Sequence, residues 1–353
     1  MERKSLMKIA NVSRRSTAHS IGPSATTKRA QTRHHHALFP VLFVLPGLLT
    51  TGYAALSLYA ATRLAYAPQQ PLLSTPGKLG LLYQDVTFPS REDHLQLRGW
   101  LIPGILPSGA LTLHRTIILV HGNSSNRADP LDGLLELSRD LAHQGFAVLA
   151  FDLRGHGTSS PAPRSLGYFE QRDVLGAVDF LRTGSLPYPE IGRPRHIGGW
   201  GISMGAATLL LASARETAIE AVISDCAYAE ILPILERDIP KVGHIPAIFT
   251  PAILLAARAT YGIDFSAVRP MDVVAHIAPR PICFIHGDAD QYVPPSHMAI
   301  LAKAASAGPS ACVQTWLVPG ADHGQSYRLQ ANHYVSRLVT FYTAALGPDL
   351  GDK

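Results

Sequence analysis

Short, uninterrupted apolar segments recur after residue 83 and constrain the fold of this chain more than any other feature. Strands buried on both faces of a parallel sheet have this appearance. Six such segments are present: Thr116–Val120, Ala147–Phe151, His196–Trp200, Ala221–Ser224, Pro281–Ile285 and Val313–Val318. Stretches with helical spacing of apolar residues lie among them: Leu131–Gln144, Asp173–Arg182, Met204–Ala214, Ser296–Ala307 and Asn332–Ala345. The alternation predicts an α/β protein with a mostly parallel, doubly wound sheet.

Two further segments extend this sheet to about eight strands. Gln84–Phe88 and Leu95–Ile102 alternate apolar with polar residues, which indicates an early hairpin. Residues 226–277 break the rhythm, because they contain apolar stretches and several prolines but no clear strand. We interpret them as a helical cap inserted over the sheet. The domain is therefore expected to span residues 83–347, followed by a short C-terminal tail at 348–353.

An uncharged segment precedes the domain. Residues 37–62 contain no charged side chain over 26 positions, more than the roughly 20 that cross a bilayer as a helix. Residues 1–36 carry eight Lys or Arg and one acid, a net charge of +7. The positive-inside rule predicts a basic cytoplasmic tail at 1–36, a transmembrane anchor at 37–62, a Pro-rich polar linker at 63–82 and an extracytoplasmic domain.

Two other interpretations of the apolar segment stay open, a cleaved signal peptide and a buried helix of a protein that has no membrane anchor. Ala65-Tyr66-Ala67 has the small-x-small pattern of a cleavage site, but Pro68 directly after it disfavours cleavage. Without its tail the chain has a net charge of −2, which gives no reason to expect nucleic acid as a partner. The three cysteines form no disulfide framework and no zinc-binding spacing. The sequence implies neither a metal nor an organic cofactor.

Chemistry is suggested by residues that follow the predicted strands. Gly201-Ile-Ser203-Met-Gly205 lies between a strand and an Ala- and Leu-rich helix, the pattern of a sharp turn that presents a serine at a helix N-terminus. A serine needs an adjacent base, and the base needs an orienting acid. Asp290 and His323 follow the last two strands, in the order that this arrangement requires.

Five motifs in this order resemble the α/β-hydrolase superfamily, and within it the serine hydrolases that include membrane-anchored αβ-hydrolase-domain proteins and related bacterial esterases. The resemblance covers about residues 83–347. The motifs are His121-Gly-Asn123, Asp152-Leu-Arg-Gly-His-Gly-Thr-Ser159, Gly201-Ile-Ser-Met-Gly205, His286-Gly-Asp-Ala-Asp-Gln-Tyr-Val-Pro294 and Gly320-Ala-Asp-His-Gly324.

This resemblance implies an α/β-hydrolase fold and a role for each residue. Ser203 would be the nucleophile, Asp290 the acid and His323 the base. The backbone N–H groups of Met204 and Asn123 would form the oxyanion hole.

Alternatives for the acid stay open. Asp288 lies two positions before Asp290, and Asp225 follows a strand where some proteins of this fold carry their acid. The resemblance also assigns structural roles to His121 and to the loop that contains Arg154 and His156.

The sequence therefore predicts a serine hydrolase, of esterase, lipase or thioesterase type, that cleaves a carboxylic ester or thioester through an acyl-enzyme. The expected partner is a small acyl substrate, and the apolar cap and membrane tether make a lipid-like one our hypothesis. A serine peptidase or amidase and a non-catalytic membrane-tethered binding module remain as alternatives. A dinucleotide-binding loop at Gly199–Gly205 is disfavoured, because Met204 stands where that motif needs glycine.

Overall fold

The computed structural model describes residues 38–348, with side chains from Val44 onward. The predicted tail at 1–36, residue 37 of the predicted anchor and residues 349–353 lie outside the described residues.

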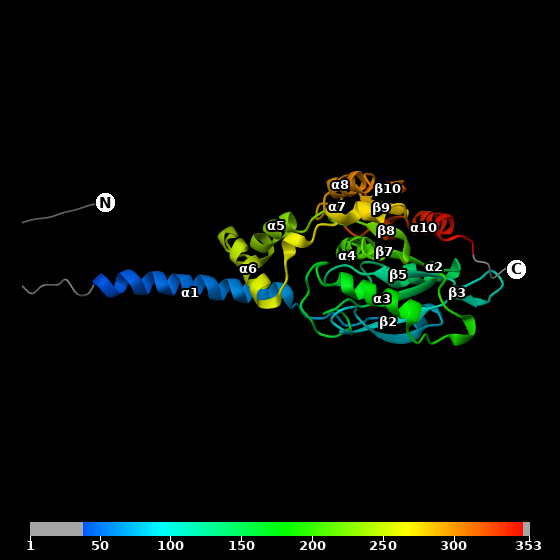
Figure 1. Cartoon of the computed structure of the whole chain (residues 1–353), viewed down its shortest axis with the longest axis horizontal. Coiled ribbons are helices and arrows are strands. Elements are labelled where there is room, and N and C mark those ends of the chain that lie inside the picture. The colour runs from blue at the N-terminus through cyan, green and yellow to red at the C-terminus, as the bar shows by residue number, and fades with distance from the viewer. Residues whose placement is uncertain (1–37, 349–353) are drawn as a thin grey trace, which may run out of the picture. The chain divides into compact units, whose positions relative to one another are not determined.

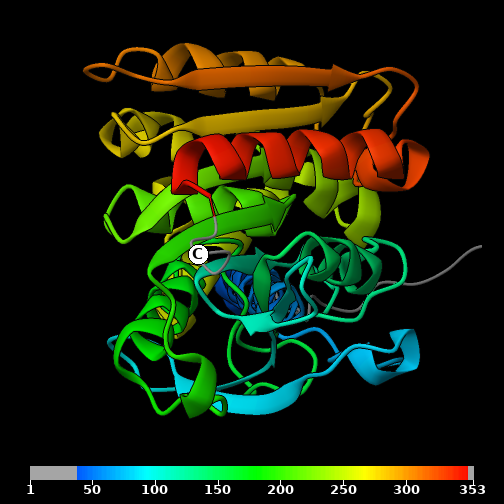
Figure 2. The same ribbon diagram turned by 90° about the vertical axis from the view of Figure 1, so that its right-hand side faces the viewer.

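Eight strands form the central sheet, and the fold class predicted from the sequence is confirmed. The order across the sheet is β1-β2-β6-β5-β7-β8-β9-β10 (Figure 2). The pairings β1–β2 and β2–β6 are antiparallel, and all other pairings are parallel. The bounds are β1 (Gln84–Pro89), β2 (Gln96–Ile102), β5 (Arg115–Val120), β6 (Ala147–Phe151), β7 (His196–Ile202), β8 (Ile219–Asp225), β9 (Ile282–Gly287) and β10 (Val313–Val318).

Helices cover both faces of this sheet, as in other doubly wound proteins. Side chains of α2 and α10 belong to one buried apolar cluster, and side chains of α3, α4 and α8 belong to the other. Figure 2 shows α10, in red, lying across one face. The bounds are α2 (Leu134–His143), α3 (Gln171–Thr183), α4 (Met204–Ser213), α8 (Ser296–Ala305), α9 (Ser326–Leu329) and α10 (Ala331–Leu346).

Some short elements have no counterpart in the sequence prediction. β3 (Gly104–Ile105) and β4 (Leu111–Thr112) form a small antiparallel ribbon whose strands are too short to leave a periodic pattern. Two 3-10 turns, η1 (Pro76–Leu79) and η2 (Pro189–Ile191), each begin at a proline.

The chain between β8 and β9 is helical, as the sequence analysis predicts. The structure describes this whole stretch, and it contains no strand. Its elements are α5 (Leu232–Gly243), η3 (Ala247–Phe249), α6 (Thr250–Tyr261), η4 (Phe265–Ala267), α7 (Pro270–Val273) and η5 (Val274–Ile277). We call the α5–α6 part of this insertion the cap (Figure 1).

The apolar segment forms helix α1 (Leu38–Ala65). Within it, Val44–Ala65 is the helix of the described residues that is long and apolar enough to cross a membrane, and only 17% of its most apolar window is buried. A signal sequence near the N-terminus satisfies the same criteria of length and composition, so a membrane anchor is indicated only weakly.

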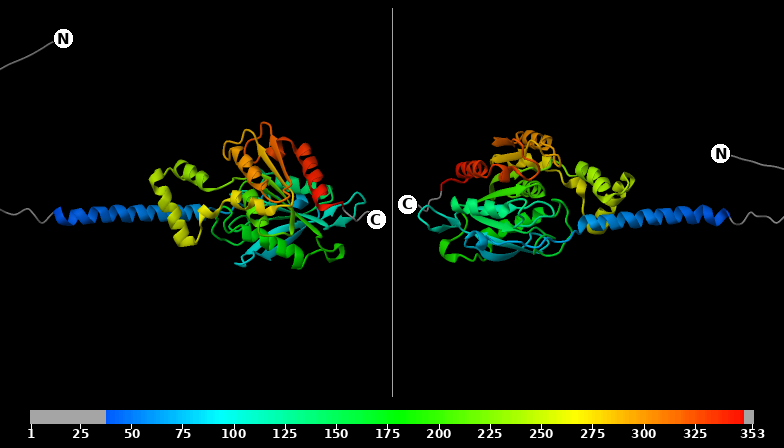
Figure 3. Two further views of the ribbon diagram at one scale, coloured as in Figure 1. Left: turned by 45° about the horizontal axis from the view of Figure 1, so that its top comes forward. Right: turned by 180° about the vertical axis from the view of Figure 1, so that it is seen from behind.

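The C-terminal half of α1 packs against the cap (Figure 3). The Tyr53 hydroxyl donates to the Ile248 carbonyl at 2.7 Å, and the Tyr53 ring stacks on that of Phe249. Nearer the end of the helix, the hydroxyls of Thr62 and Tyr261 lie 2.7 Å apart. The last turns of α1 are therefore held against the domain by specific contacts.

The predicted linker at 63–82 also lies against the domain. The Gln69 amide donates to the carbonyls of His156 and Ser159, at 3.1 and 2.9 Å. The Asn126 amide in turn donates to the carbonyls of Gln70 and Pro71, both at 3.2 Å. These bonds bring the chain after α1 close to the loops that follow β5 and β6.

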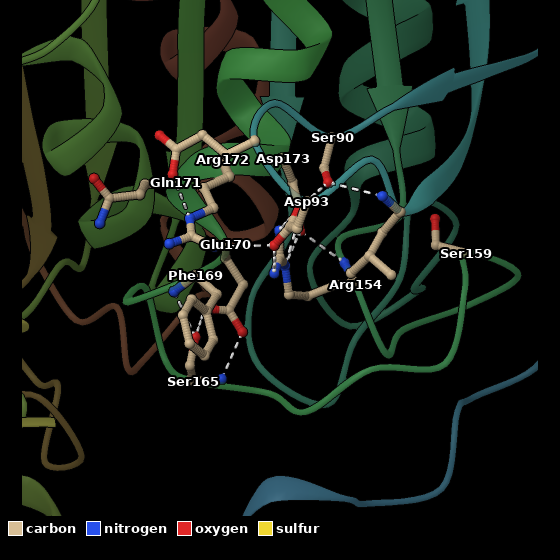
Figure 4. A network of polar contacts seen from close by, with 12 residues as sticks. Ser90, Asp93, Arg154, Ser159, Ser165, Phe169, Glu170, Gln171, Arg172 and Asp173 are labelled. Carbon is tan, nitrogen blue, oxygen red and sulfur yellow. Dashed lines mark hydrogen bonds and ion pairs between the residues drawn. The ribbon is translucent and has the colours of Figure 1, made fainter. Parts of the chain in front are cut away.

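A buried ion cluster joins the β1–β2 turn to α3 (Figure 4). Arg154, in the loop after β6, donates to Asp173 on α3 and to Asp93 in the turn, each at 2.6 Å. Close by, the Glu170 carboxylate accepts from the backbone N–H of Ser165 at 2.6 Å and of Gly167 at 2.8 Å. These bonds of Arg154 and Glu170 fix the loop that begins at the carboxyl end of β6 and leads to α3.

Candidate active site

Ser203 stands on a strained turn at the carboxyl end of β7. It separates the last residue of β7 from the first residue of α4, and its backbone adopts φ +53° and ψ −120°. This left-handed conformation is rare outside glycine and is found mostly where function or packing enforces it. The turn directs the serine away from the sheet at the N-terminus of a helix.

The two glycines of the motif are required by close backbone packing. A Cβ at residue 201 would lie 2.6 Å from the carbonyl oxygen of Gly205. A Cβ at residue 205 would overlap the carbonyl oxygen of Val120, at the end of β5. The helix can approach the strands this closely only because both side chains are absent.

The structure brings Ser203, Asp290 and His323 together at this edge of the sheet. His323 Nε2 lies 2.8 Å from Ser203 Oγ, and His323 Nδ1 lies 2.7 Å from Asp290 Oδ2. Because an ionised carboxylate only accepts, Nδ1 carries the proton and Nε2 is left to accept from the serine hydroxyl. A basic nitrogen therefore faces the hydroxyl.

Asp290 is held in its ionised form. Burial alone would raise its pKa, but hydrogen bonds from His286 and His323 and from the backbone outweigh burial and hold the pKa well below the usual range. Its Oδ1 accepts from the backbone N–H groups of Tyr292 and Val293, at 2.9 and 2.8 Å. The carboxylate is thus fixed in position and keeps a negative charge beside the imidazole.

The other candidate carboxylates have different partners. Asp288 Oδ1 accepts from the backbone N–H of Gly320 at 2.6 Å. Asp225 is buried and accepts from the hydroxyls of Tyr334 and Ser326, at 2.8 and 3.2 Å, and burial raises its pKa to about 6. By geometry, Asp290 is the partner of His323.

Two further histidines lie near the site but are engaged elsewhere. His121 Nε2 accepts from the backbone N–H of Leu153 at 3.0 Å, and its Nδ1 lies 2.7 Å from the Gly122 carbonyl. Burial lowers the pKa of His121, so this ring is neutral and connects the loops after β5 and β6. His156 is also buried, with Nδ1 2.8 Å from the Arg154 carbonyl.

The two groups predicted to form the oxyanion hole border the same space as Ser203. Met204 is the first residue of α4, so no carbonyl within the helix can accept from its backbone N–H. Asn123 follows β5 and is exposed. Asn123 and Met204 both line the cavity that Ser203 enters.

This cavity has a volume of about 560 Å³. Most of its wall is apolar and comes from the cap, with Leu166 from the loop between β6 and α3. Ile231 lines the cavity directly before the cap, and the lining residues of the cap are Ile234, Leu235, Asp238, Ile239, Val242, Gly243, Ile245 and Ile253. Such a wall suits an acyl chain or another apolar group.

The sequence analysis did not anticipate three contributions to the site. Tyr59, Ala60, Arg63 and Leu64 of α1 line the cavity, although the sequence assigns them to an anchor and a linker. The sequence does contain an indication that α1 packs against protein, because the small residues Ser57, Ala61 and Ala65 recur every fourth position, as in closely packed helices. In the structure all three are buried. Small residues at this spacing indicate a face of the helix that packs closely.

The second contribution that the sequence analysis did not anticipate is that of His286. Its Nε2 lies 3.2 Å from Asp290 Oδ2 and 2.7 Å from the Val293 carbonyl. The third is Cys226, which follows β8 with φ +45°. Its sulfur, an Asp290 oxygen and a His323 nitrogen lie within 4.8 Å of one another, and among the described residues this is the group that could hold a metal ion. Burial raises the pKa of Cys226 well above its usual value, which disfavours the thiolate that a metal needs.

Known proteins resemble this chain in sequence and in structure. It is 27% identical to the Escherichia coli (strain K12) protein YfhR over 260 residues, which are 73% of this chain and 80% of that protein. It is 31% identical to the lysophosphatidylserine lipase ABHD12 of Macaca fascicularis over 195 residues, 51% of this chain and 43% of that protein. The Pyrococcus furiosus esterase Pf2001 superposes with a TM-score of 0.64 at 23% identity and covers 80% of this chain and all of its own.

A model of the alpha/beta hydrolase family matches residues 117–337, well over half of the chain. This match includes the last four residues of β5, the strands β6 to β10, and the stretches that carry Ser203, Asp290 and His323. This match, together with the sheet order and the helices on both faces, shows that the chain belongs to the alpha/beta hydrolase family.

Proposed function

We propose that this protein is a membrane-anchored serine hydrolase that cleaves a carboxylic ester or thioester through an acyl-enzyme. One observation carries the proposal: His323 lies within hydrogen-bond distance of both the Ser203 hydroxyl, at 2.8 Å, and the Asp290 carboxylate, at 2.7 Å. This is the arrangement that converts a weakly nucleophilic hydroxyl into an attacking group.

The proposed reaction has two stages. Ser203 Oγ attacks the acyl carbonyl while His323 Nε2 takes its proton, and the same proton is then given to the departing alcohol or thiol. In the second stage His323 takes a proton from water, the resulting hydroxide attacks the acyl-enzyme, and Ser203 regains its proton. The charge of Asp290 stabilises the imidazolium that forms in each stage.

Negative charge on the carbonyl oxygen needs stabilisation in both stages. The backbone N–H of Met204, at the N-terminus of α4, and that of Asn123 are our candidates for the oxyanion hole. The helix dipole adds to the effect of the Met204 N–H. Loss of one such donor in other enzymes costs about 3 kcal/mol of transition-state stabilisation.

We propose a lipid-like acyl ester as the substrate class. Three features support it: the apolar cavity, the wall that α1 adds to it, and the partial similarity to a lysophosphatidylserine lipase. The +7 charge of residues 1–36 favours a cytoplasmic N-terminus and an extracytoplasmic domain for the anchored protein.

Hydrolysis of p-nitrophenyl esters with acyl chains from acetyl to palmitoyl tests this substrate class. The proposal predicts that kcat/KM is higher for medium or long chains than for acetyl. A preference for acetyl would exclude the lipid-like substrate. An anilide with the preferred chain distinguishes an esterase from an amidase, since the proposal predicts much slower cleavage of the anilide.

A cavity-filling variant sharpens the experiment. Ile239 lines the cavity on α5 and is half-buried, so Ile239→Trp is expected to shift the preference toward shorter chains. Ile300 on α8 is 41% exposed and does not line the cavity, and Ile300→Trp serves as its control. An unchanged chain-length profile in Ile239→Trp would mean that the acyl chain does not occupy this cavity.

A further inference from the structure

The charged groups that border the cavity are few. Among the described residues that line it, Arg63 of α1 and Asp238 of α5 are the ones that carry a formal charge. The remaining lining is apolar or neutral. An ionic group of a ligand in this cavity would therefore meet few charged side chains besides these two.

Asp238 already has partners within the protein. Its carboxylate accepts from the Arg237 side chain at 2.7 Å. Arg237 in turn lies over the Tyr292 ring. The negative charge of Asp238 is therefore compensated locally and leaves the cavity without an unpaired acid among its described lining residues.

Arg63 differs in this respect. It has no ion pair or side-chain hydrogen bond with any residue that the structure describes, and its side chain is exposed. A guanidinium is always charged, and its fork of N–H donors fits the paired oxygens of a carboxylate or a phosphate. The cavity therefore presents one uncompensated cation to whatever occupies it.

The backbone that carries Arg63 is held in place by its neighbours. Ala61 and Ala65 are fully buried, and the Thr62 hydroxyl lies 2.7 Å from that of Tyr261 on the cap. Leu64, next in the chain, lines the cavity as well. The position of the Arg63 backbone relative to the cap is thus set by packing, and the side chain extends from a fixed point of the cavity wall.

We propose that Arg63 forms an anion subsite of the catalytic cavity and selects acyl substrates that carry a phosphate or carboxylate group. The apolar wall would hold the acyl chain, Ser203 would face the carbonyl and Arg63 would bind the anion. This inference rests on the proposed hydrolase function and adds a specificity-determining residue to it.

Two substrates that differ only in the anion test the subsite: 1-dodecanoylglycerol and its 3-phosphate. For the wild-type protein we expect a higher kcat/KM on the phosphate-bearing ester. Arg63→Gln is expected to lower kcat/KM on that ester about fivefold and to leave the neutral ester within twofold, the size typical of one partly exposed ion pair. The preference should also fall with added salt, because exposed charges are screened.

Two variants serve as controls. Arg63→Lys keeps the charge and is expected to retain most of the preference. Arg258→Gln removes an exposed arginine on α6 that does not line the cavity, and is expected to behave as wild type on both esters. An equal loss on both esters in Arg63→Gln, or no loss on either, would overturn the subsite.

Binding to the Ser203→Ala variant keeps this inference separate from the hydrolase proposal. In that background, Arg63→Gln is expected to weaken binding of the phosphate-bearing lipid and not of the neutral one. Arg63-dependent binding without any hydrolysis by wild type would overturn the hydrolase proposal and leave the anion subsite standing. Hydrolysis that depends on Ser203 but is indifferent to the anion and to Arg63 would overturn the subsite alone.

Discussion

At the scale of single residues, two buried carboxylates lie near the candidate base, and their surroundings distinguish them. Asp290 accepts from imidazole and backbone N–H groups, which hold its pKa below the usual range. Asp225 accepts from two neutral hydroxyls, and burial raises its pKa to about 6. Only the first of these environments keeps a full negative charge in hydrogen-bond contact with His323.

This difference predicts effects of very different size on kcat for two amide substitutions. Asp290→Asn is expected to lower kcat by about four orders of magnitude, because an amide does not hold the imidazole in the required tautomer. Asp225→Asn is expected to stay within tenfold of wild type. Ester hydrolysis by the two folded variants measures both effects. A loss in Asp225→Asn as large as in Asp290→Asn would move the acid to residue 225.

The sequence alone predicted that Ser203, Asp290 and His323 meet, because each follows a parallel strand and such strands end at one edge of a sheet. It left Asp225 and Asp288 open, because spacing along the chain does not reveal where a carboxylate points. The contacts of His286 and Cys226 with the site depend on side-chain packing, which no motif encodes. The roles of the three residues remain predictions until they are tested in solution.

At the scale of elements, the ion cluster around Asp93 connects the β1–β2 turn to α3 (Figure 4). Burial alone would raise the pKa of Asp93, but hydrogen bonds from Arg154 and Ser90 lower it to about 2. Since the pKa is about 4 in an unfolded chain, the ionised carboxylate stabilises the fold above that pH. This contribution is lost as the pH falls through about 2.

Asp93→Asn therefore has a pH-dependent effect on stability. At neutral pH it is expected to lower the free energy of unfolding by about 1 kcal/mol, allowing for solvent screening, and the difference should shrink as the pH approaches 2. Urea unfolding between pH 3 and 7 measures this difference. Asp272→Asn, which removes a more exposed ion pair with Arg269, is the control. A difference that stays constant across this range would contradict the assignment.

The strands and helices of the sheet were predictable because buried segments have a clear periodicity, and β6 begins and ends at the predicted residues. Helix α1 was predictable as a helix, but not as a wall of the cavity. Its apolar composition is suited equally well to a position in a bilayer and to packing against the apolar side chains of the folded domain. Only the regular spacing of Ser57, Ala61 and Ala65 hinted that one face of it packs closely.

At the scale of the whole molecule, three parts of the chain meet at the cavity. The edge of the sheet carries the proposed nucleophile and its partners, the cap supplies an apolar wall, and the end of α1 supplies a cation. Hydrogen bonds of Gln69 and Asn126 also tie the chain after α1 to the loops that follow β5 and β6. A substrate with an acyl chain and an anionic group would contact all three parts.

Covalent labelling of the full chain with a fluorophosphonate shows whether Ser203 is an activated nucleophile. We expect folded wild-type protein and Ser306→Ala, a control at an exposed serine on the surface, to be labelled to the same extent. Ser203→Ala, with an unchanged melting temperature, should not be labelled. Labelling of Ser203→Ala at the wild-type level, or no labelling of the folded wild-type protein, would mean that Ser203 is not an activated nucleophile.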